Sequence, residues 1–117
     1  MRAAEVAFVG ALVYSHPWLT PILQEHIDDN DGVLPHLLLA DIERWAEAQL
    51  KEHGPTDEQL RKVLTFLETE YAAGHSHVDE LISVSFLELL PRPGEPLFEL
   101  RTLVGPRLSK QLEAIGW

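Results

Sequence analysis

Apolar residues recur at helical spacing along this chain, in successive runs that prolines and glycines separate. The pattern is clearest in the middle of the chain, where Leu60, Val63, Leu64, Leu67 and Tyr71 follow one another at intervals of three and four. Such spacing places the side chains on one face of an α-helix and not on one face of a strand. A chain made of such runs buries its apolar stripes by packing helix on helix, so we predict an all-α fold.

The breaks between the runs predict five to seven helices. They cover residues 3–14, 18–28, 35–52, 57–73, 78–90, 97–103 and 106–115. Proline pushes the residue before it out of the α region, and glycine adopts the left-handed conformation that ends many helices. The sequence Thr56-Asp57-Glu58-Gln59 predicts a capping box, in which Thr56 is the N-cap and Gln59 reaches back to it.

The segment 78–90 is the most apolar part of the chain and is expected to be central and buried on most sides. A strand is the competing interpretation, because residues 82–86 alternate between apolar side chains and serine. We favour a helix, since Asp79 and Glu80 suit a first helical turn and the apolar pattern is longer than a strand. Residues 91–96 contain three prolines and are predicted to be a linker.

A length of 117 residues supports one domain, spanning 1–117, because a second hydrophobic core would have too little chain. Within this single helical domain, the 91–96 linker precedes the C-terminal helices. The order of the helices allows either an irregular helical bundle or a short helical stack, since two pairs of predicted helices have similar lengths.

The charge of the chain argues against several kinds of partner. Nineteen Asp and Glu against nine Lys and Arg give a net charge of −10, which repels the phosphates of nucleic acids. No apolar run approaches the roughly 20 residues of a membrane-spanning helix, so we expect no membrane partner. The apolar run of residues 6–14 follows Glu5 and lacks a convincing cleavage site, which argues against a secretory signal. We therefore expect a cytoplasmic protein.

The sequence offers no recognisable catalytic or metal-binding set, so we expect a non-enzymatic protein without a cofactor or metal. Cysteine is absent, and His75 and His77 lie in one loop with no matching third and fourth ligand. Glu68 and Glu88 each interrupt an apolar helix and are candidate acids or bases with a raised pKa. The alternative for both is structural, either in an ion pair or as the cap of a neighbouring helix.

Acidic residues are concentrated around the turn between the second and third predicted helices. If the third helix packs back on this turn, they form a negative face that suits a basic protein partner. A merely solvated face is the alternative. The candidate partner-binding residues are Glu25, Asp28, Asp29, Asp31, Asp41, Glu43 and Glu47.

Three stretches of the sequence resemble a family of small helical proteins. They are residues 34–45 (LPHLLLADIERW), 63–68 (VLTFLE) and 79–90 (DELISVSFLELL), which together span about half of the chain. The family consists of uncharacterised, acidic bacterial domains that are similar to immunity proteins of contact-dependent or polymorphic toxin systems. The resemblance implies a non-enzymatic binder encoded beside a toxin, and it brings no catalytic residues with it.

Charge and resemblance together predict an immunity protein that docks an acidic face on a cognate toxin, which is expected to be basic. The alternative is a homodimeric structural or regulatory adaptor that uses Trp117 and the C-terminal helix. The two hypotheses differ in whether the chain associates with itself.

Overall fold

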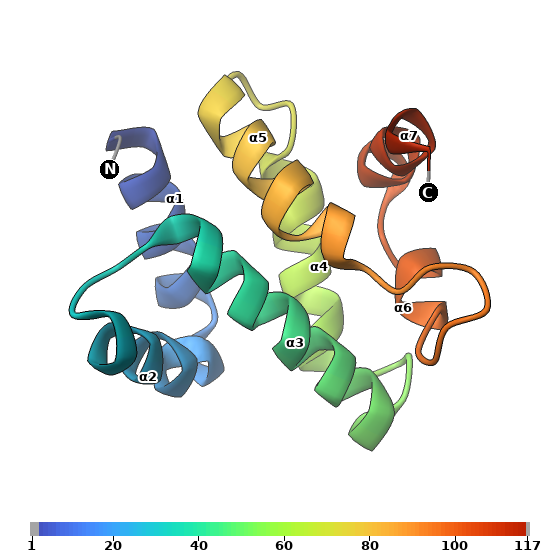
Figure 1. Ribbon diagram of the computed structural model, residues 1–117, viewed down its shortest axis with the longest axis horizontal. Helices are drawn as coiled ribbons and strands as arrows, with labels where there is room; N and C mark the ends of the chain where they lie inside the picture. The colour runs from blue at the N-terminus through green and yellow to red at the C-terminus, as the bar shows by residue number, and fades with distance from the viewer. Residues whose placement is uncertain (1–2, 117) are drawn as a thin grey trace.

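The protein is built from α-helices joined by short turns. A computed structural model describes residues 3–116, and no strand occurs among them. The prediction of an all-α fold is confirmed (Figure 1). The helices are α1 (Ala3–Ser15), η1 (Pro17–Leu19, a 3-10 turn), α2 (Thr20–Asn30), α3 (Pro35–His53), α4 (Glu58–Glu70), α5 (Ser76–Ser85), η2 (Leu87–Leu89, a 3-10 turn), α6 (Glu99–Thr102) and α7 (Pro106–Ile115).

Helix α5 occupies the centre of the fold, where it packs against α1, α3 and α4 (Figure 1). Leu81 and Ile82 on this helix are fully buried, as are Phe86 and Leu87 just beyond it. The preference for a helix over a strand in this segment is confirmed. The predicted single helix to residue 90 is wrong, because Phe86 leaves the helical conformation with φ −127° and the chain continues as the turn η2.

Helices α2 and α3 pack against each other and carry the candidate site. Helix α2 ends at Asn30, and Asp31 adopts a left-handed conformation with φ 55° that reverses the chain. Helix α3 then starts at Pro35, whose missing N–H is not needed in the first turn. Its Leu38, Leu39, Ile42 and Ala46 are buried and hold α3 on the core.

The start of α4 differs from the predicted capping box. Asp57 is the N-cap, and its side chain accepts a hydrogen bond from the Leu60 N–H at 2.9 Å. Thr56 stands one residue too early for this role. Asp and Thr are both good N-caps, so the motif TDEQ fits two registers and only the start of the helix distinguishes them. Helix α4 ends at Glu70, three residues before the predicted end, and Ala72 turns the chain with φ 62°.

The C-terminal segments fold back on the rest of the molecule. Residues 92–96 are exposed turns, and then α6 packs against α3 while α7 packs against α4 and η2. Leu108 and Leu112 of α7 are buried, whereas Ile115 is partly buried. Trp117, which the adaptor hypothesis uses, lies outside the described residues.

A helix that spans a membrane must be both long and apolar. Among residues 3–116, no single helix meets both requirements. Helix α1 and the segment Pro17–Asn30 meet them only when taken together, and the chain bends by 109° between them.

Candidate protein-docking site

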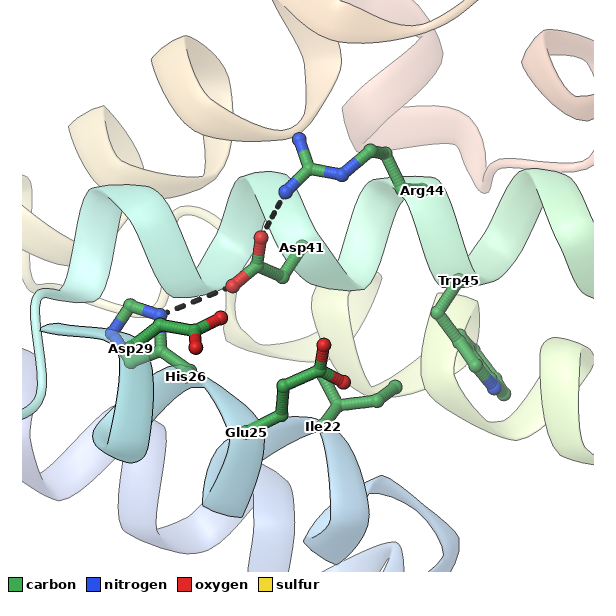
Figure 2. A pocket seen from close by; sticks show the side chains of 7 residues that line it. All are labelled: Ile22, Glu25, His26, Asp29, Asp41, Arg44 and Trp45. Atoms are coloured by element: carbon green, nitrogen blue, oxygen red, sulfur yellow. Dashed lines mark hydrogen bonds and ion pairs between the residues drawn. The ribbon is translucent and has the colours of Figure 1, made fainter.

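A pocket opens between α2 and α3, on the side of the molecule where the acidic turn lies (Figure 2). Its volume is about 460 Å³. Most of its lining residues are polar or charged, and the indole of Trp45 stands at one end (Figure 2). The lining residues are Ile22, Glu25, His26, Asp29, Asp41, Arg44 and Trp45.

His26 ties the two walls of this pocket together. Its imidazole is buried, and Nε2 accepts a hydrogen bond from the backbone N–H of Leu34 at 3.0 Å. Nδ1 lies 3.1 Å from Oδ2 of Asp41 on α3. A backbone N–H can only donate, so Nε2 carries a lone pair and Nδ1 carries the proton that points at Asp41. These two hydrogen bonds therefore hold the ring in one orientation.

This arrangement makes His26 a structural residue. A general base needs a free lone pair facing the substrate, and here Leu34 occupies that lone pair. Asn30 adds a second link, because its side-chain amide donates to the carbonyl oxygen of His26 at 2.9 Å. The end of α2 and the turn that leads to α3 are thus fixed in one geometry.

The charges around the pocket are unevenly compensated. Asp41, with a side chain 28% exposed, forms an ion pair with Arg44 one turn further along α3 and accepts the hydrogen bond from His26. Glu25 and Asp29 are exposed on α2, and within residues 3–116 neither forms an ion pair. Figure 2 shows the Glu25 carboxylate directed into the space between the two helices. The pocket therefore keeps two uncompensated negative charges.

The structure divides the seven predicted partner-binding residues into two groups. Glu25, Asp29 and Asp41 line the pocket. Asp28 and Asp31 are exposed beside it, at the end of α2. We call these five residues the acidic face. Glu43 and Glu47, the other two predicted residues, do not belong to it.

Glu43 corrects the sequence-based prediction most clearly. Its side chain is buried, with the residue only 2% exposed, so it cannot contact a docked partner. Burial, with a smaller contribution from a hydrogen bond and the negative charge of Glu47, raises its pKa to about 9, although the charge of Arg44 acts in the opposite direction. Glu43 therefore carries a proton at neutral pH. Glu47 is half-buried and is engaged with Glu43 instead of with the acidic face.

The sequence contains a signal for the position of Glu43. Leu39, Ala46 and Leu50 stand four, three and seven residues from Glu43 on α3, which places Glu43 on the same helical face as all three. All three are buried. A count of acidic residues along the chain does not show that Glu43 is buried. The angular position of Glu43 on the helix does show it, because that position falls among apolar residues. The role of His26 had no such signal, because it depends on a backbone N–H eight residues downstream.

Among the candidate acids and bases, Glu68 has a structural role. Glu68 accepts hydrogen bonds from the N–H groups of Arg107 at 2.9 Å and Leu108 at 3.1 Å. It thus caps α7, which confirms the structural alternative for this residue. Glu88 is half-buried in η2. Across residues 3–116, no three histidine or carboxylate side chains gather around a point where a metal ion could bind.

A histidine and a serine also meet at the contact of α3 with α5. Nδ1 of His36 lies 2.5 Å from Oγ of Ser85. Ser85 is buried, at 6% exposure, and it stands in the last turn of α5. A nucleophile must reach a substrate carbonyl, and a hydroxyl in this position does not. The pair therefore connects the start of α3 to the end of α5.

Comparison with known proteins identifies one family that the chain matches. No curated protein and no solved structure matches the chain. Residues 3–117 match a family described as "Domain of unknown function (DUF7674)". Because this match spans nearly the whole chain, the protein belongs to the DUF7674 family.

Proposed function

We propose that this protein is a non-enzymatic binding module that neutralises a cognate bacterial toxin in the cytoplasm by docking the acidic face on it. The observation that carries the proposal is the pair of uncompensated carboxylates, Glu25 and Asp29, at the mouth of a preformed pocket. The resemblance of residues 34–90 to immunity proteins supports the same function.

The electrostatics of the acidic face favour a basic partner. A concave surface lined by charges of one sign concentrates the field and speeds the approach of an opposite charge. Such steering raises association rates to about 10⁸–10⁹ M⁻¹s⁻¹ at low salt, which an inhibitor of a lethal enzyme needs. The net charge of −10 adds a long-range attraction of the same sign.

The pocket provides a position for one cationic side chain of the partner. A lysine or arginine that enters between α2 and α3 meets Glu25 and Asp29 and places its methylene groups on Ile22 and Trp45. An indole face also attracts a cation directly. Because His26 and Asp41 fix the pocket walls, little ordering is needed when the partner binds.

Co-expression tests this function. The probe is the C-terminal toxin domain of a secreted protein encoded next to this gene in its own genome. We expect the protein to restore growth of cells that express the domain, and to bind it in vitro at one to one. Binding should weaken strongly between about 50 mM and about 500 mM salt, because screening removes the attraction.

A pair of charge-reversal variants locates the interface. Glu25→Lys with Asp29→Lys should slow association at least about tenfold. Glu52→Lys with Glu113→Lys changes the net charge equally at two exposed sites elsewhere, so it should have a much smaller effect. Equal effects of the two variants would mean that the acidic face is not the interface. Absence of both rescue and binding would overturn the proposed function itself.

A further inference from the structure

Helix α1 exposes a face without any charge. Phe8, Val9, Leu12 and Val13 turn one side of the helix to the core. The opposite side is open to solvent, and Glu5, which is half-buried, is the one charged residue of the helix. We call this side the apolar face of α1, and its residues are Ala3, Val6, Ala7, Gly10, Ala11 and Tyr14.

Such a face is unusual on the outside of a protein with a net charge of −10. A helix that covers a core normally carries polar residues on its outer side, and one that is apolar all round is normally buried. Here Val6 is 50% exposed and Tyr14 is 80% exposed. Contiguous apolar surface of this kind marks an interaction site.

The apolar face of α1 has a projection, a flat centre and a hollow along its length. Tyr14 projects at one end. At the centre, a Cβ added to Gly10 would have no atom within 4 Å, so nothing among residues 3–116 covers this position. Towards the other end, Ala4 and Ala7 line a pocket of about 260 Å³, which Glu70 and His75 close from the side of α4 and α5.

We propose that a second copy of this chain covers the apolar face, with the two α1 helices packed antiparallel. A two-fold axis between Gly10 and Ala11 brings residue 14 of each helix level with residue 7 of the other. Tyr14 of each copy then packs on Ala7 of the other, at the edge of the pocket, where Glu70 and His75 are within reach of its hydroxyl group. The projection of each copy thus meets the hollow of the other, so the same two surfaces are used on both sides, as an isologous interface requires.

Charge favours a second copy over an anionic membrane as the occupant of this face. A contact between two uncharged faces brings no like charges together, although each chain carries −10. An anionic lipid surface would instead repel the molecule. The acidic face, which attracts cationic partners, lies on α2 and α3, so the dimer goes beyond the proposed function and does not depend on it. It also differs from an adaptor dimer made by Trp117 and the C-terminal helix.

The size of the contact predicts a weak dimer. Thirteen residues of helix are about 20 Å long, and a pair of such helices buries less than the roughly 800 Å² per partner of a standard interface. We therefore expect a rapidly exchanging dimer whose population grows with concentration. Sedimentation equilibrium of the full chain between about 10 μM and about 1 mM should show this growth.

Two variants test the geometry. Tyr14→Glu places a charge at the two-fold contact, and Gly10→Leu places a bulky side chain where the helices cross. Each should raise the dissociation constant at least about tenfold. Both positions are open to solvent in the single chain, so thermal unfolding by circular dichroism should show that both variants still fold. Leu89→Glu is the control, because Leu89 is also exposed and apolar but lies in η2.

Each possible outcome of these measurements either supports or overturns the proposed dimer. A dimer that both variants weaken and the control leaves unchanged supports the proposal. A chain that remains monomeric over the whole range overturns it, and so does a dimer that withstands both α1 variants. Loss of toxin binding has no bearing on this result, since Tyr14 and Gly10 do not line the acidic pocket.

Discussion

Glu43 places a carboxyl group in the interior of a protein that has eighteen other acidic residues. Its Oε2 is buried and has no hydrogen-bond partner within the part of the chain that the structure describes. Removing a carboxylate from water is costly, so the group keeps its proton and its pKa rises to about 9. An unpartnered buried polar atom of this kind lowers the stability of the fold.

The raised pKa of Glu43 predicts how stability depends on pH. The folded-state pKa of about 9 exceeds the unfolded value near 4.5, so ionisation favours the unfolded chain as pH rises between them. The contribution of the neutral group is complete below about pH 4.5 and is lost as pH rises towards 9. Glu43→Gln stays neutral at every pH. It should leave stability nearly unchanged at about pH 4 and raise it by at least about 1 kcal/mol at about pH 8.

Urea unfolding of both proteins at several pH values measures this difference. Glu47→Gln is the matched control, because it removes the neighbouring charge and leaves Glu43 buried. It should reproduce only part of the change. A gain in stability that is the same at all pH values would show that Glu43 is ionised in the folded protein.

The hydrogen bonds of His26 lead to a second prediction, which concerns the stability of the fold. Replacement by alanine leaves the Leu34 N–H without its acceptor, removes the bond to Asp41 and opens a cavity. We expect His26→Ala to lower the free energy of unfolding by about 2–3 kcal/mol. His53→Ala, at an exposed position on α3, should change it by less than about 0.5 kcal/mol. Equal, small effects of the two changes would contradict the bridging role of His26.

At the scale of an element, α7 depends on a residue of α4. The first turn of a helix has N–H groups without partners inside the helix, and an acceptor there also interacts favourably with the helix dipole. Glu68 binds two of these groups in α7, those of Arg107 and Leu108. We expect Glu68→Ala to lower the free energy of unfolding by about 1–2 kcal/mol, measured by urea unfolding. Glu113→Ala removes the same charge from an exposed site and should have little effect.

Gly105 provides a second way to remove the contact between Glu68 and α7. A Cβ at this position would lie 2.5 Å from the Cδ atom of Glu68, so Gly105→Ala displaces the capping side chain. The two substitutions then remove the same interaction, and their effects should not add in the double variant. Additive losses would mean that Glu68 does not cap α7.

The helices themselves followed largely from the sequence, because their apolar stripes repeat with helical spacing and their ends carry prolines and glycines. The starts of α3 at Pro35 and α7 at Pro106 are examples. The break of α5 at Phe86 was not visible, since the apolar pattern continues through it into η2. Of the candidate site, Glu25, Asp29 and Asp41 could be found by charge. Their convergence on a pocket depends on how α2 packs on α3, which local spacing does not encode.

At the scale of the whole molecule, the acidic residues of α2 lie at positions where their negative charge destabilises the fold. Glu25 and Asp29 are four residues apart on one helix, a spacing at which like charges repel. Asp28, Asp29 and Asp31 crowd the C-terminal end of α2, where the helix dipole is already negative. A surface that served solubility alone would place these charges more evenly. Binding sites commonly contain residues that lower the stability of the fold, so this arrangement is typical of a binding site.

This reasoning predicts that position matters more than net charge. Glu25→Lys with Asp29→Lys and Glu52→Lys with Glu113→Lys both change the charge from −10 to −6, because each reversal adds two. Lysines at 25 and 29 still repel each other, and both variants gain from the helix dipole, because Glu52 and Glu113 also lie in the last turns of helices. Only the α2 pair also replaces repulsion by Asp28 and Asp31 with attraction, so it should raise the free energy of unfolding by about 0.5–1 kcal/mol more than the other pair at low salt. At about 1 M salt, screening should close most of this gap. If the two variants gained equally at low salt, the acidic face would be no more strained than the rest of the surface, and its charge would need no binding function to explain it.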